Sequence, residues 1–230
     1  MKKDRFGYYV FALGFAGYMV RRLLYTVGVD SRGLLVRWHG LEIVLWVISA
    51  AAVVLSLTAK PVRQTPKPWV APVGCWFLAI GMLFAGQDLV NGFAGLRTIL
   101  KIAAPLAAIV LAAAGWRIWK GKDLSPTVWS FVCLVLVVRL VAAYQTWSRE
   151  PQMMDYLFSL LASLSFAGFA YQQAALALGL PKAREWRLRL GLLSGYFGLV
   201  AGTGRTALFF YTLTACGVLL PLLSGEEAPC

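Results

Sequence analysis

The stretch LVLVVRLVAAYQTW, residues 134–147, is almost entirely leucine, valine and alanine, with a single arginine, Arg139, near its middle. An apolar run of this kind predicts a helix in the core of a lipid bilayer. A guanidinium at that depth costs about 3 kcal/mol on insertion scales, so it should face a protein interior or a wet cavity. The charge therefore belongs either to a functional site or to a buried structural ion pair.

The composition of the whole chain agrees with a membrane location. Of 230 residues, 60% are hydrophobic and 14% are charged, whereas soluble domains carry about 25% charged residues. The apolar residues form continuous blocks instead of the alternating strands that build β-barrels. Lysine and arginine that flank membrane spans explain the net charge of +12 better than nucleic-acid binding does. The sequence thus predicts an all-α, polytopic transmembrane bundle with the lipid bilayer as partner.

Eight membrane spans can be drawn, and they form one transmembrane domain over residues 1–230 without a soluble domain. The spans cover residues 6–27, 41–58, 69–87, 96–115, 126–146, 154–178, 188–203 and 206–223. The seventh has an apolar core of only about fifteen residues, so a re-entrant segment and seven crossings form the alternative.

A repeated spacing suggests how the spans are paired. Proline, cysteine and glutamine follow one another at intervals of seven and twelve residues twice, at Pro68, Cys75 and Gln87 and at Pro126, Cys133 and Gln145. Each triple starts a span at one side of the membrane and ends it at the other. This favours tandem helical hairpins, with a chance match as the alternative.

Basic residues predict the orientation of the chain. Thirteen of the 22 lysines and arginines fall on the side of the N-terminus and eight on the opposite side. Because cytoplasmic loops are enriched in these residues, both termini are predicted in the cytoplasm. The first span begins like a signal peptide, but Arg21 and Arg22 follow its apolar run in place of a cleavage site, so a retained helix is expected.

The sequence lacks familiar catalytic and metal-binding motifs. It contains no P-loop, GxGxxG, HExxH or GxSxG. None of its four cysteines stands in a CxxC pair, and His39 is its only histidine. No catalytic residue, metal or cofactor is therefore predicted, and an intramembrane enzyme acting on lipid is the least favoured function.

Several polar residues are expected near the intramembrane arginine, on the outer side of the membrane. Asp155, near the start of the sixth span, and Asp88, at the end of the third, are its candidate ion-pair partners. Lys101, Tyr144 and Gln145 would complete the wall of an outward-facing polar pocket. Such a pocket fits a small anionic or zwitterionic solute. The alternative is that these residues are ordinary helix ends that meet the lipid headgroups.

The seventh span carries four glycines at helical spacing, Gly191, Gly195, Gly198 and Gly202, which we call the glycine strip. Steps of four, three and four place them on one helical face. Glycines on one face let a neighbouring backbone approach closely. The strip predicts tight helix packing, with a sliding or hinge helix as the functional alternative.

Two segments carry a resemblance to known proteins. They are VDSRGLLVRWHG (residues 29–40), with Asp30, Gly33-Leu34-Leu35 and His39, and RLVAAYQTWSREPQMMDY (residues 139–156), with Arg139, Tyr144, Pro151-Gln152 and Asp155-Tyr156. Both resemble a group of uncharacterised bacterial multi-pass inner-membrane proteins. The resemblance implies a location in the bacterial cytoplasmic membrane and implies no activity, substrate or site.

These observations lead to two hypotheses of function. In the first, the protein binds or passes a small solute through the outward-facing pocket, with Arg139 as the central charge. In the alternative, it is a membrane subunit or sensor that recruits a protein partner through helix packing faces, with the glycine strip as the interface.

Overall fold

The computed structural model describes residues 6–27, 40–59, 69–85, 94–122, 125–147, 153–180, 182–202 and 207–223. This described part of the chain is all-helical, with eight α-helices and no strand. The helices are α1 (Phe6–Val27), α2 (Gly40–Thr58), α3 (Val70–Leu83), α4 (Ala94–Trp119), α5 (Pro126–Trp147), α6 (Met153–Ala177), α7 (Ala183–Ala201) and α8 (Ala207–Leu223). The predicted all-α bundle is confirmed.

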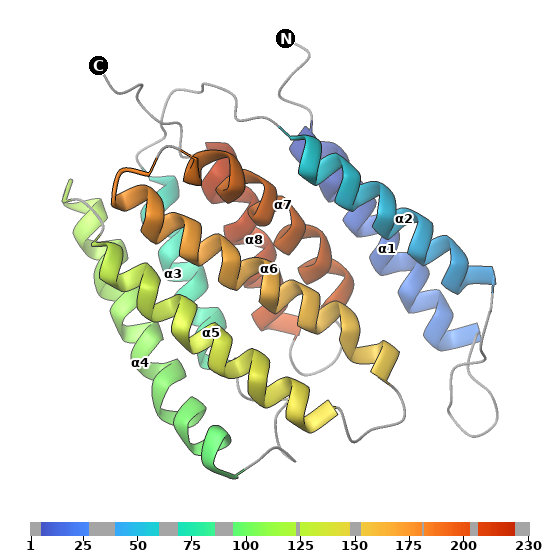
Figure 1. Ribbon diagram of the computed structural model, residues 1–230, viewed down its shortest axis with the longest axis horizontal. Helices are drawn as coiled ribbons and strands as arrows, with labels where there is room; N and C mark the ends of the chain where they lie inside the picture. The colour runs from blue at the N-terminus through green and yellow to red at the C-terminus, as the bar shows by residue number, and fades with distance from the viewer. Residues whose placement is uncertain are drawn as a thin grey trace.

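Successive helices run in opposite directions and pack as four hairpins (Figure 1). α1 packs against α2, α3 against α4, α5 against α6 and α7 against α8, as tandem hairpins require, but α6 also packs extensively against α7, so the predicted repeat of hairpins stays a prediction. Of the triples that suggested them, Pro68 and Gln87 lie outside the described residues. α1 begins and α8 ends at the same end of the bundle, which we call the N-terminal end; the opposite end is the distal end (Figure 1).

Large apolar side chains cover the outside of the bundle. Val47 and Val54 on α2 and Ile102 and Ile109 on α4 are each more than 60% exposed. Four helical stretches are long and apolar enough to cross a membrane, namely Gly7–Val27, Gly40–Thr58, Gly95–Trp119 and Pro126–Gln145. An apolar exterior on helices of this length is stable only in a lipid environment, so the fold is that of an integral membrane protein.

The helix ends differ from the predicted spans at two places that matter for the site. α3 ends at Leu83, although the third span was expected to continue to residue 87. With 14 residues it extends about 21 Å, less than the hydrocarbon core of about 30 Å. α7 begins five residues before the predicted seventh span, because the charged stretch before Leu188 is already helical.

α7 is the central helix of the bundle. It contacts α1, α2, α6 and α8, while α8 lies between α7 and α3. From Arg187 to Gly202 none of its residues is exposed. A membrane helix enclosed by other helices can carry polar residues that a helix facing lipid cannot, and this explains the short apolar core of the seventh predicted span.

The glycine strip of α7 is buried and packs against α8. A Cβ atom on Gly198 would lie 2.9 Å from the carbonyl oxygen of Phe210, and one on Gly202 would collide with the ring of Tyr211. The hydroxyl of Thr214 on α8 also donates to the carbonyl of Gly195 at 3.2 Å. The strip is therefore an internal packing face, as predicted, and a protein partner could reach it only by displacing α8.

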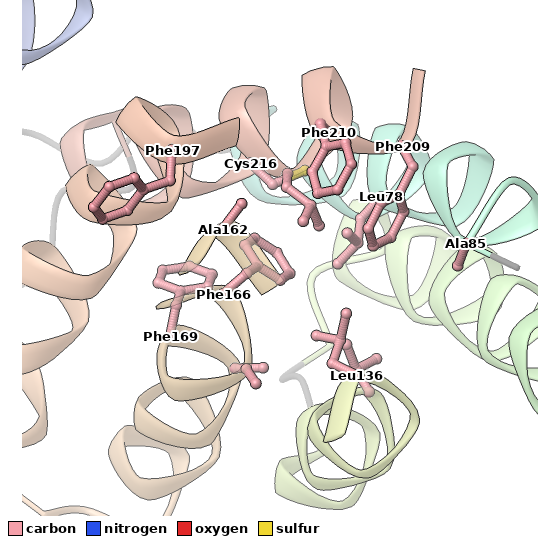
Figure 2. Packing of buried hydrophobic residues seen from close by; sticks show 14 of the residues in the cluster. Leu78, Ala85, Leu136, Ala162, Phe166, Phe169, Phe197, Phe209, Phe210 and Cys216 are labelled. Atoms are coloured by element: carbon pink, nitrogen blue, oxygen red, sulfur yellow. The ribbon is translucent and has the colours of Figure 1, made fainter. Parts of the chain in front are cut away.

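An aromatic layer fills the interior between Arg139 and the N-terminal end; we define it as Trp129, Phe166 and Phe169. The rings of Phe166 and Phe169 have centroids 5.2 Å apart, and Trp129 meets Phe169 edge-on at 6.0 Å. Figure 2 shows Phe166 and Phe169 on α6 with Phe209 and Phe210 of α8 above them. The polar groups around Arg139 therefore lie between this layer and the distal end of the bundle.

Candidate functional site

Arg139 is completely buried in the bundle. It lies thirteen residues after the start of α5 at Pro126, or about 20 Å along the helix axis. Its exposed fraction is 0%, so the expectation that it faces the protein interior is confirmed. A charge removed from both water and lipid in this way requires hydrogen-bonding partners.

Two of the partners lie just beyond α3 and on α6. The Nε atom of Arg139 donates to the carbonyl oxygen of Ala85, just beyond α3, at 2.7 Å. Its Nη1 atom donates to the hydroxyl of Ser163 on α6 at 2.8 Å. That hydroxyl donates in turn to the carbonyl of Ser159, one turn earlier, at 2.9 Å. The guanidinium thus joins α3, α5 and α6.

The early end of α3 explains why a cation is favourable at this position. The last carbonyls of a helix have no partner within the helix and carry the negative end of its dipole. The N–H groups of Phe84 and Ala85 satisfy the carbonyls of Gly81 and Met82 at 3.0 and 3.1 Å. The carbonyl of Ala85 itself follows this turn, and Arg139 satisfies it. Without water, an unsatisfied carbonyl at this depth costs several kcal/mol.

Two aromatic rings at the start of α8 complete the surroundings of the guanidinium. The Cζ atom of Arg139 lies 4.3 Å from the ring centroid of Phe209 and 5.3 Å from that of Phe210. A cation over an aromatic face gains up to about 2 kcal/mol where both groups are desolvated. In Figure 2, Phe209 and Ala85 lie on the same side of Leu136, which is one helical turn before Arg139. Four helices therefore converge on one side chain.

A second buried arginine, Arg21 on α1, repeats this arrangement at the end of α7. Its Nη1 atom donates to the carbonyl of Val200, in the last turn of α7, at 2.6 Å, and its exposed fraction is 4%. Its Cζ atom lies 5.4 Å from the ring centroid of Phe158 on α6. Nothing in the sequence pointed to this role of Arg21. Its exposed neighbour Arg22 carries the same charge, so composition alone gave no signal to tell them apart.

The other predicted site residues are not gathered around Arg139 in the described part of the chain. Lys101 and Gln145 are exposed, and Tyr144 is 57% exposed. Asp88 lies outside the described residues, and Asp155 lies in the first turn of α6 with a side chain that is also outside them. The groups in contact with the guanidinium include a backbone carbonyl, a serine and two phenylalanines, none of which was in the predicted set.

Among the described residues, the cysteines do not form a second site. Cys75 and Cys216 are buried, and the Cys216 thiol donates to the carbonyl of Gly74 at 3.0 Å, which links α8 to α3. His39 lies outside the described residues. Within the described helices and turns, His, Cys, Asp and Glu side chains form no group of three or more that could hold a metal ion.

No protein-family model, curated protein or solved structure matches this chain.

Proposed function

We propose that this chain is a protein of the bacterial cytoplasmic membrane that binds or passes a small anionic or zwitterionic solute, with Arg139 as the central charge. The observation that carries the proposal is the complete burial of the Arg139 guanidinium inside a membrane bundle. Charges within the membrane are rare because they are costly, and they commonly mark substrate or ion pathways. The basic residues near the N-terminal end support a cytoplasmic position for that end.

The short helix α3 supports the same proposal. It ends at Leu83, directly before the carbonyl that Arg139 binds. Irregular backbone is tolerated at membrane depth only inside protein or beside a cavity. In membrane transporters the N-terminal ends of interrupted helices face anionic substrate groups, whereas backbone carbonyls and C-terminal ends coordinate cations. The C-terminal end of α3 holds the Arg139 cation in the same way, and the guanidinium is the group that would bind an anionic solute.

A polar stripe on α6 supports an opening toward the distal end. Ser159 and Ser163 are buried and four residues apart, and Asp155 occupies the preceding step of four. Residues at this spacing share one helical face. The stripe leads from the distal start of α6 to Arg139, and the aromatic layer lies beyond it toward the N-terminal end. A solute route along these groups would open on the outer side.

The hydrogen bonds of Arg139 indicate how a solute would be held. A carboxylate or phosphate accepts stronger, charge-assisted hydrogen bonds from a guanidinium than a carbonyl or hydroxyl does. An anionic solute would thus displace the acceptors on Ala85 and Ser163. Because Arg139 has no exposed surface, the solute reaches it only when one of the helices around the guanidinium moves. Solute binding would therefore be coupled to helix movement.

The proposal is tested by a thermal-unfolding screen of the purified protein in detergent. Small carboxylates, phosphates and zwitterions are added one at a time to wild type and to Arg139→Gln. A solute that binds the folded protein raises its Tm. We expect at least one of these classes to raise the Tm of wild type and to leave that of Arg139→Gln unchanged.

Arg21→Gln is the matched control, because it also removes a buried guanidinium that binds a helix-end carbonyl. It should lower the starting Tm and keep the response to the solute. A solute that stabilises Arg139→Gln as much as wild type would contradict the proposal, and so would a screen in which no anion or zwitterion stabilises the wild type.

A further inference from the structure

Arg187, like Arg139, is a buried arginine, but it lies at the N-terminal end of the bundle. It is the fifth residue of α7, so its backbone is about 6 Å inside the start of that helix. Its exposed fraction is 7%, whereas Lys182 is exposed and the side chain of Arg189 is 23% exposed. Arg187 therefore differs from the basic residues that flank a membrane helix and face the headgroups.

The position of Arg187 on α7 directs its side chain toward the interior of the bundle. It stands one turn before Gly191, so it continues the glycine strip that packs against α8. Its Nη1 atom donates to Oε1 of Gln173 on α6 at 3.5 Å. Arg189, two residues later, points about 200° away, and its Nη2 atom lies 3.4 Å from a carboxylate oxygen of Glu185 at the surface. The charge of Arg187 thus lies on the face of α7 that meets α6 and α8.

One face of α6 leads from the site at Arg139 to this second guanidinium. Ser159, Ser163, Phe166, Ala170 and Gln173 follow one another at steps of four, three, four and three, so they share one side of the helix. The first four are buried and Gln173 is half-buried. Polar side chains therefore occupy both ends of this face, and Ser163 and Gln173 are about 15 Å apart along the axis.

The aromatic layer separates the two polar ends of this face. Phe166 and Phe169 are 0% exposed and Trp129 is 2% exposed. Their rings contact one another at centroid distances of 5.2 and 6.0 Å. Packed apolar side chains of this kind exclude water, and an apolar constriction without water blocks the passage of charged solutes. The layer is therefore a closed barrier between Arg139 and Arg187.

We propose that Arg187 and Gln173 form a second binding site for the anionic solute, and that the aromatic layer is the gate between this site and Arg139. The second site rests on the proposed function of Arg139, and it means that the solute passes through the bundle instead of only binding. A guanidinium donates charge-assisted hydrogen bonds to a carboxylate or phosphate, and the amide of Gln173 can turn to donate as well. Their mutual contact at 3.5 Å is long for a hydrogen bond, so an anion replaces it at little cost.

The burial of Arg187 selects a small solute as the occupant. A lipid headgroup at this end of the bundle meets the exposed side chain of Lys182, which lies before the first turn of α7. Arg187 has little surface and faces the interior, so a small anion that enters between the helix ends fits it better than a lipid or a protein.

The second site is tested with thiol reagents of opposite charge. The protein carries Gln173→Cys, and its four native cysteines are replaced by alanine. Membrane-impermeant methanethiosulfonates with a sulfonate or a trimethylammonium group are added on the side of the N-terminal end, and each rate is divided by that reagent's rate with free glutathione. On this scale the sulfonate reagent should react faster. Arg187→Gln should lower its advantage roughly tenfold, because a unit charge about 6 Å from the thiol acts with opposite sign on the two reagents.

Arg189→Gln is the matched control, because it removes a guanidinium from the outer side of α7 two residues away. It should leave the advantage of the sulfonate reagent unchanged, and so should Arg187→Lys, which keeps the buried charge. Equal losses in Arg187→Gln and Arg189→Gln would overturn the proposal, and so would a thiol at position 173 that neither reagent reaches. These rates do not depend on Arg139, so a failure of the second site is distinguishable from a failure of the solute site there.

The gate is tested with a thiol on the distal side of the aromatic layer. Ala162 is buried one turn before Phe166 on α6 (Figure 2), so Ala162→Cys should resist both reagents from the side of the N-terminal end. Removing one ring of the layer, in Phe166→Ala or Phe169→Ala, should raise its rate at least tenfold. Phe158→Ala is the control, because it removes a ring of the same size from α6 outside the layer. A thiol that stays protected in both layer variants would overturn the gate, and so would equal exposure in the control.

Discussion

The Nε atom of Arg139 lies 2.7 Å from the carbonyl oxygen of Ala85, directly after the last turn of α3. The charge that stands out in the sequence therefore compensates a helix end that the sequence does not reveal. A carbonyl left without a donor at this depth is costly, and a buried guanidinium without acceptors is costlier still. The guanidinium supplies the donor that the carbonyl needs, and the carbonyl supplies an acceptor for the guanidinium. This hydrogen bond leads to the first two predictions.

Replacing Arg139 with leucine should destabilise the protein. The change leaves the Ala85 carbonyl and the Ser163 hydroxyl without their donor, so we expect a loss of about 2–5 kcal/mol in the free energy of unfolding. Arg139→Lys should lose less, because it keeps the charge although one ammonium group cannot reproduce both hydrogen bonds. Denaturant unfolding in detergent measures both variants. A leucine variant that unfolds at or above the wild-type midpoint would show that the guanidinium does not stabilise the bundle.

The link between Arg139 and Ser163 can be measured separately. In Ser163→Ala the Nη1 atom loses one acceptor, which should cost about 1–3 kcal/mol. In the double variant Arg139→Gln with Ser163→Ala, the two effects should fall short of their sum by about 0.5–3 kcal/mol, as expected for residues in direct contact. Ser130→Ala is the control, since its exposed hydroxyl bonds only locally to the carbonyl of Pro126. Full additivity of the two changes at Arg139 and Ser163 would argue against the contact.

The close approach of α7 and α8 gives a third prediction. Alanine at Gly198 would place its Cβ atom 2.9 Å from the backbone oxygen of Phe210, which cannot turn aside as a side chain could. Overpacking of this kind costs about 1–3 kcal/mol. Alanine at Gly40 meets nothing within 4 Å and serves as the control. Unfolding midpoints that are the same for both variants would mean that the helices are not held at this distance.

The sequence predicted the helices better than the site, for a physical reason. Apolar runs define which segments are helical, and an arginine in such a run must face the interior, so the bundle and the burial of Arg139 followed directly. The spacing also placed Tyr144 near the level of Arg139. The position of a residue along the helix axis does not determine which face of the helix it occupies, however. Five residues turn a helix by about 140° relative to the starting side chain, and Tyr144 is exposed.

The sequence also did not indicate that the backbone carbonyl of Ala85 would accept a hydrogen bond from Arg139. Every residue carries a backbone carbonyl, and only the end of α3 singles this one out. That end comes four residues before the predicted limit of the span. Likewise, nothing in the adjacent pair Arg21 and Arg22 shows which guanidinium enters the bundle, because packing against α7 decides it.

That pair provides the last prediction, since two neighbouring arginines with equal charge differ in burial. Arg21→Gln removes the donor to the Val200 carbonyl and the contact with the ring of Phe158, so it should lower the free energy of unfolding by about 1–3 kcal/mol. Arg22→Gln changes the net charge equally at an exposed position and should stay within about 0.5 kcal/mol of wild type. Denaturant unfolding of the two variants under the same conditions gives the comparison. Equal losses of unfolding free energy in the two variants would indicate that the positive charge itself stabilises the protein. They would contradict a specific stabilising role for the hydrogen bond from Arg21 to the Val200 carbonyl at the end of α7.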